Sequence, residues 1–175
     1  RANRTTGLVL RLLRGTGARP LEIGGLDASD MVIEASVPFI HIRPNNHRGL
    51  KTFNSARLVP LVGDALEAAR VLARVRETGA LFPHRCHETG ALSARLNKAL
   101  RSAGIPKSDR LTAYSFRHTL EQLLRLSDAP FDVQQAIMGH APSTMTDRYG
   151  AKRVSLQRMQ SAMVQAMSID QYTEQ

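Results

Sequence analysis

Five residues spread along the chain carry the side chains that metal-free phosphoryl transfer needs. In order, they are Arg19, Lys51, Arg117, His140 and Tyr149. Breaking a phosphodiester without a metal takes a nucleophile, cationic donors for the non-bridging oxygens, an acid for the departing oxygen and a hydrogen-bonding partner for the nucleophile. The five residue types can fill these roles. Their order therefore indicates an enzyme that acts on a phosphodiester, provided that the fold brings them together.

The two arginines are the candidates for holding the phosphate. Arg19 follows a glycine turn at residues 15–17 and precedes a short predicted helix that contains Glu22, and Arg117 lies in a later predicted helix. The planar guanidinium group can donate to two phosphate oxygens at once. The alternative for Arg19 is an ordinary surface arginine that pairs with Glu22.

Lys51 is the candidate for the general acid. The chain has twenty arginines and four lysines, and Lys51 is the only lysine before Lys98. An acid must be able to give up its proton, which a lysine of lowered pKa can do and an arginine cannot. Lys51 lies in a polar, basic loop predicted at residues 44–55, so a solvated lysine at a hairpin tip is the alternative.

Tyr149 is the best candidate for the nucleophile among three tyrosines. It lies nine residues after His140, beside Arg148, and follows a segment able to start a helix. Tyr172 lies in a C-terminal tail, residues 168–175, that we expect to be frayed. Tyr114 is close to Arg117 in sequence, which favours lining the site over attacking.

The whole ordered set resembles the tyrosine recombinase family, which includes the phage integrases, over about residues 5–167. The resemblance implies an α+β, mostly helical bundle with one small three-stranded antiparallel sheet, forming a single catalytic domain over residues 1–175. It implies that Lys51 is the general acid, that His140 hydrogen-bonds near the scissile phosphate, and that Tyr149 forms a 3′-phosphotyrosyl link. It implies no metal and no cofactor, and an N-terminal DNA-binding domain outside this chain.

Tyr114 departs from the family pattern, which usually has a histidine three residues before the second arginine. A tyrosine can form a hydrogen bond, but its pKa near 10 makes it a poor base at neutral pH. His118 is a nearby candidate for handling the proton. Its alternative is a histidine that hydrogen-bonds the backbone inside the helix bundle.

The charge of the chain indicates a polyanionic partner. Its net charge is +9, which favours nucleic acid, here double-stranded DNA. Further arginines predicted to bind DNA are Arg43, Arg48, Arg57 and Arg148. The single cysteine, Cys86, excludes a disulfide within the chain and fits a reducing compartment, so we expect a cytoplasmic, DNA-associated protein.

A metal site and a membrane span are both disfavoured by the sequence. Cys86 lies between His84, Arg85 and His87, but the ligands are crowded for zinc and no second half-site follows. No window approaches the roughly 18 apolar residues that a membrane span needs.

The elements that must position these residues follow from hydrophobic periodicity and from glycine and proline positions. We predict helices at 5–13, 64–77, 92–103, 112–126, 131–138 (closed by Gly139) and 155–167. A β-rich segment is predicted at 31–43 and a short strand at 56–61.

Two questions stay open at this point. The last helix is methionine-rich and either packs on its own domain or docks on a neighbouring copy, as family members do in a DNA-bound tetramer. The function has two alternatives, a type IB topoisomerase-like enzyme that nicks and closes DNA, and a catalytically silent DNA-binding relative.

Overall fold

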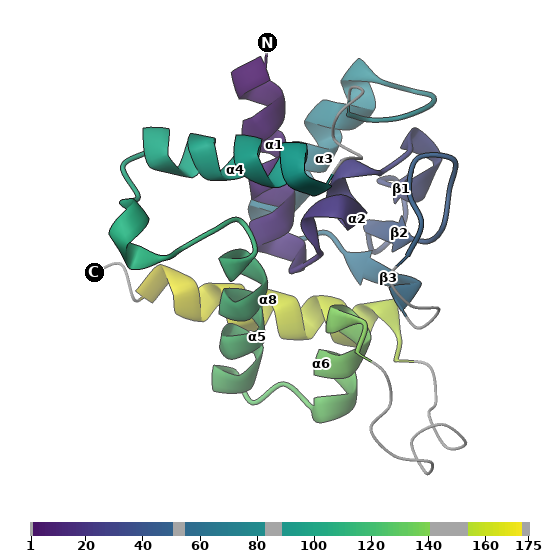
Figure 1. Cartoon of the computed structure of the whole chain (residues 1–175). Coiled ribbons are helices and arrows are strands. Elements are labelled where there is room, and N and C mark those ends of the chain that lie inside the picture. Colours follow the sequence, from purple (N-terminus) through teal and green to yellow (C-terminus); the bar gives the residue numbers. More distant parts are fainter. Residues whose placement is uncertain (1, 51–54, 83–88, 141–153, 173–175) are drawn as a thin grey trace.

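The computed structural model describes residues 2–50, 55–82, 89–140 and 154–172 (Figure 1). These residues form a mostly helical domain with one three-stranded antiparallel sheet, as the sequence predicted. The helices are α1 (Ala2–Thr16), α2 (Pro20–Gly24), α3 (Gly63–Val75), α4 (Thr89–Ser102), α5 (Ser115–Leu126), α6 (Phe131–Met138) and α8 (Leu156–Tyr172). Two short 3-10 turns, η1 (Ala28–Asp30) and η3 (Lys107–Asp109), lie between them.

Helix α1 forms the centre of the helical part and contacts α3, α4 and α5. Its buried face carries Val9, Leu12 and Leu13, each almost fully enclosed, at the spacing of a helix with one apolar stripe. The approach to α3 is close, because a Cβ at Gly15 would lie 2.5 Å from the Cβ of Ala65. A glycine at position 15 is therefore what allows the two helices to touch.

The sheet has the order β1 (Met31–Val32), β2 (Phe39–Ile42), β3 (Arg57–Pro60). In the β2–β3 register Ile40 faces Val59, and both side chains are fully buried. Strand β3 also contacts α6 and α8. Strand β3 is thus held against the C-terminal helices α6 and α8.

Most predicted elements are present, and α6 with its closing glycine is confirmed residue for residue. Gly139 has φ +64, the left-handed conformation that ends a helix. The start of α5 differs from the prediction at Thr112, because the Ser115 hydroxyl accepts a hydrogen bond from the Thr112 backbone N–H and the helix begins at Ser115.

The prediction of a frayed tail at 168–175 is wrong for residues 168–172, where α8 continues to Tyr172, and residues 173–175 lie outside the described part of the chain. Helix α8 packs on α5, α6 and β3 of its own domain. Met159, Met163 and Ala166 are buried there, and Ile169 packs against the same core. Among the described residues, no helix combines the length and apolar character needed to cross a membrane.

Candidate phosphate-binding site

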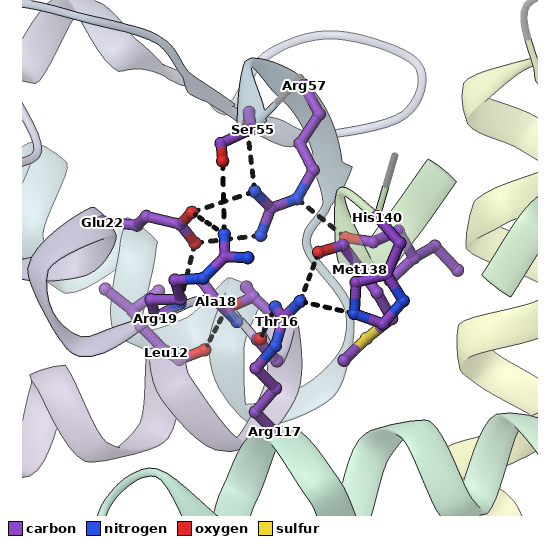
Figure 2. Close-up of polar contacts among 12 residues, drawn as sticks. Leu12, Thr16, Ala18, Arg19, Glu22, Ser55, Arg57, Arg117, Met138 and His140 are labelled. Carbon is purple, nitrogen blue, oxygen red and sulfur yellow. Dashed lines mark hydrogen bonds and ion pairs between the residues drawn. The ribbon is translucent and has the colours of Figure 1, made fainter. Parts of the chain in front are cut away.

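Arg117 is the centre of the site and is 3% exposed. It lies in the first turn of α5, and its Nη1 donates to the Gly17 carbonyl at 2.7 Å. Its Nη2 donates to the Met138 carbonyl at 2.6 Å. These two bonds join α5 to the turn after α1 and to the end of α6, so one guanidinium group fixes the relative placement of three segments (Figure 2).

His140 comes directly after the left-handed Gly139 and turns its ring toward Arg117. The distance from His140 Nε2 to Arg117 Nη2 is 3.1 Å. Burial, and then the positive charge of Arg117, lower the pKa of His140. Arginine can only donate hydrogen bonds, so Nε2 is the acceptor and the neutral ring carries its proton on Nδ1.

Arg19 points toward the same place from the start of α2 (Figure 2). Its Nη1 donates to Glu22 Oε1 at 2.7 Å and its backbone N–H donates to Glu22 Oε2 at 2.7 Å. The Arg19 side chain stays a quarter exposed. Within the described part of the chain, Nη1 is the only nitrogen of its guanidinium group with a bonded partner. The pairing with Glu22 thus holds the group and leaves donors free for a ligand.

Glu22 is the acid of this cluster and is 4% exposed. Arg57 binds it through Nη1 to Oε1 at 3.2 Å and through Nη2 to Oε2 at 3.0 Å. Burial would raise the pKa of Glu22, but the hydrogen bonds and charge of Arg57, together with the bonds from Arg19, outweigh it and lower the pKa. The carboxylate is therefore ionised at neutral pH and shared between two arginines.

The structure does not support two of the arginines that we assigned to DNA from sequence. The side chains of Arg48 and Arg57 are only 3% and 6% exposed. Arg48 donates to the carbonyls of Glu22 and Arg43 and pairs with the buried Asp30. Both guanidinium groups are bound inside the protein, so neither is placed to contact DNA.

Arg43 remains accessible, with a side chain that is 42% exposed while its Nε donates to Asp30 at 2.8 Å. Its assignment to DNA therefore stays a prediction.

Tyr114 and His118 lie at the solvent side of α5. Tyr114 is the N-cap residue of the helix and is 43% exposed. The two rings meet edge to face, with centroids 5.2 Å apart. His118 is exposed, so its alternative reading as a histidine inside the bundle is wrong.

Several predicted residues lie outside the described part of the chain. Lys51, Arg148 and Tyr149 are among them, and so is the segment with Cys86 and its neighbouring histidines. Their roles stay predictions.

The described site brings three arginines, one carboxylate and one neutral histidine together, which gives it a surplus of positive charge. Sequence reasoning identified Arg19, Arg117 and His140, but it missed the part played by Ser55, whose hydroxyl lies 3.5 Å from Arg19 Nη1. It also missed that Glu22 pairs with Arg57. An arginine fork with partly free donors, held by a buried carboxylate, is suited to a phosphate group.

Comparison with known proteins agrees with this arrangement. A family model described as "Phage integrase family" matches residues 2–155. The integrase from mycobacterium phage Brujita is similar in structure, with a TM-score of 0.67 and 21% identity over 93% of this chain and 52% of that chain. No curated protein matches the sequence.

The integrase of the transposon Tn1549 is a second structural relative. Its complex with circular intermediate DNA gives a TM-score of 0.54 and 23% identity, over 91% of this chain and 59% of that chain. Its complex with transposon right end DNA gives a TM-score of 0.52 and 23% identity, over 90% of this chain and 57% of that chain. The chain thus spans between half and three fifths of these integrases, and the likeness shows a shared fold.

Proposed function

This chain belongs to the phage integrase family, and on that premise we propose that it is the catalytic domain of a site-specific DNA recombinase. It would cut and rejoin double-stranded DNA through a covalent link between Tyr149 and the 3′ phosphate. We also propose that the protein acts in the cytoplasm, in association with DNA. The +9 net charge of the chain and the DNA-bound state of the Tn1549 integrase structures support DNA as the partner.

The observation that carries the proposal is the convergence of Arg19, Arg117 and His140 from three separate segments. Arg117 reaches the Gly17 carbonyl across 100 residues of sequence. Burial, and then the positive charge of the nearby Arg19, lower the pKa of Arg117. Two like charges kept this close favour an anion between them.

The proposed reaction assigns one task to each residue. The Tyr149 oxygen attacks phosphorus and gives its phenolic proton to solvent water, while the bond from phosphorus to the 5′ oxygen breaks. Lys51 gives a proton to that 5′ oxygen. Arg19 and Arg117 hold the non-bridging oxygens, whose negative charge is redistributed in the transition state.

Rejoining runs the same bond changes and proton transfers in reverse. A 5′ hydroxyl of the same or another strand attacks the phosphotyrosyl link and releases Tyr149. The phosphodiester energy stays in the covalent link, so neither ATP nor a metal is required. Neutral His140 presents its Nδ1–H as a donor, which suits a phosphate oxygen or the leaving group.

We also propose that copies of the protein assemble on DNA as a tetramer through α8. In the described structure Met159 and Met163 of α8 are buried against their own domain. Assembly through this helix would exchange these contacts for equivalent ones on a neighbouring copy. Such an exchange costs little contact area, because the same apolar side chains are buried before and after it.

Covalent trapping tests the proposed reaction. The complete protein is incubated with a pool of nicked duplexes of randomised core sequence, and protein–DNA adducts are separated under denaturing conditions. We expect adducts for the unaltered protein and for Tyr172→Phe, and none for Tyr149→Phe, which should still bind the duplexes. Absence of adducts from the unaltered protein supports the silent DNA-binding alternative. Adducts from Tyr149→Phe would show that another residue is the nucleophile.

An assay on a supercoiled plasmid distinguishes the recombinase from the remaining alternative, a topoisomerase-like enzyme. Relaxation of a supercoiled plasmid by single protein molecules, with no recombinant product from paired sites, would favour the topoisomerase-like enzyme over the recombinase.

A further inference from the structure

Arg57 joins three segments of the chain through one guanidinium group. Its Nη1 and Nη2 bind the two carboxylate oxygens of Glu22 in α2. Its Nη1 also donates to the Ser55 carbonyl at 2.9 Å, just before β3. Its Nε donates to the Ile137 carbonyl at 2.8 Å, at the end of α6 and 80 residues away in sequence. All three nitrogens of the fork are therefore used.

The side chain of Arg57 also lies directly against the residue before His140. A Cβ at Gly139 would come within 2.8 Å of both Cδ and Nη1 of Arg57. Gly139 in turn follows Met138, whose carbonyl binds Arg117. Arg57 and Arg117 thus bind the carbonyls of two adjacent residues, Ile137 and Met138, at the end of α6.

We propose that Arg57 is a positioning residue, which keeps His140 and Arg19 in place relative to each other by linking the end of α6 to the Glu22 carboxylate. It acts on His140 through the Ile137 carbonyl and Gly139, and on Arg19 through the shared Glu22. This inference rests on the proposed function only where a reaction rate is measured, because the placement of His140 can be measured without DNA.

The geometry requires an arginine at this position. Lysine has three donors on a single nitrogen and cannot reach two carboxylate oxygens and a carbonyl on another segment with a planar fork. All three nitrogens of the Arg57 guanidinium group already bind partners within the protein, so this side chain is poorly placed for direct DNA contact. Arg57 should therefore affect the rate of the reaction and leave the affinity for DNA almost unchanged.

The test uses Arg57→Lys, which keeps the charge beside Glu22 and so avoids an unpaired buried carboxylate that could prevent folding. The matched control is Arg70→Lys, because Arg70 forms an exposed pair with Glu67 on α3. Both variants are made in the complete protein, and near-ultraviolet circular dichroism confirms that each is folded.

The first readout is the imidazole ¹⁵N spectrum of His140 without DNA. We expect the Nδ1–H form in the unaltered protein and in the control, because Arg117 donates to Nε2. In Arg57→Lys we expect a mixture of both tautomers. A tautomer distribution identical to that of the unaltered protein overturns the proposal, whatever the rate.

The second readout is the rate of adduct formation at saturating DNA, on a duplex recovered from the randomised pool. We expect Arg57→Lys to be slower by between about ten and a hundredfold, since a displacement of about 1 Å can cost that much, with affinity within about twofold. A normal rate would overturn the proposal, as would a large loss of affinity with a salt dependence reduced by about one phosphate contact. If the unaltered protein forms no adduct, the proposed function fails, and the spectrum alone decides the role of Arg57.

Discussion

Replacing Glu22 by glutamine removes the negative charge on which the arginine cluster depends. The carboxylate is 4% exposed and accepts four hydrogen bonds, one from each of Arg57 Nη1, Arg57 Nη2, Arg19 Nη1 and the Arg19 backbone. A glutamine has one acceptor oxygen, and its amide hydrogens would face the Arg57 donors. The variant therefore leaves a buried guanidinium group without a counter-charge.

The expected loss follows from the burial of both partners. Removing one member of a buried ion pair costs about 3–5 kcal/mol of unfolding free energy, because the other charge is left uncompensated. The matched control is Glu67→Gln, whose pair with Arg70 is exposed on both sides, 46% for Arg70 and 57% for Glu67. Exposed pairs contribute about 0–1 kcal/mol. The two variants remove the same chemical group, so burial is the main difference between them.

Urea unfolding at neutral pH measures both losses. The pKa of Glu22 is lowered in the folded state, so its contribution is present above the ordinary value of 4.5 and is lost as the pH falls through the folded pKa. The gap between the unaltered protein and Glu22→Gln should therefore shrink in acid. If Glu22→Gln lost no more stability than Glu67→Gln at neutral pH, the buried pair would not hold the cluster together.

Two further predictions concern the turn that carries His140. Gly139→Ala should lose more unfolding free energy than Gly79→Ala. Both glycines have positive φ, which costs about 1–2 kcal/mol once a Cβ is present, but only at Gly139 would the new Cβ lie 2.8 Å from Arg57. Equal losses in the two variants would argue against the Arg57 contact. The folded state lowers the pKa of His140 below its ordinary 6.5, through burial and then the charge of Arg117. The unfolded chain therefore takes up this proton first, and stability falls as the pH drops through about 6.5 toward the lower pKa of the folded state. His140→Gln should make this decline shallower, and an unchanged slope in a pH series of urea melts would contradict the shift.

The sequence was informative where a local signal decides the structure. A glycine after an apolar run ended α6, because a left-handed residue is needed there and glycine adopts that conformation without cost. The positions of Arg19, Arg117 and His140 in one site could be anticipated from their order and residue types. The family pattern supplied the expectation that distant segments would meet.

The sequence did not predict features that depend on contacts between distant segments. Arg48 and Arg57 stand in an acid-free basic segment, which indicates a solvated or DNA-facing surface. Their partners Asp30 and Glu22 are 18 and 35 residues away in sequence, so no local pattern could reveal that the arginines face inward. The length of α8 was underestimated for the same reason, since the packing of Ile169 on the core decides it.

The bond between Arg117 and the Gly17 carbonyl has a consequence for the order of folding. It spans 100 residues, and the bond from Arg57 to the Ile137 carbonyl spans 80. Contacts of such large sequence separation form only after the intervening chain has closed its loop, and so they come late in folding. A partly synthesised chain that ends before α5 has Arg19 but neither Arg117 nor His140. A growing chain therefore completes the cluster of Arg19, Arg117 and His140 only after residue 140 has been made.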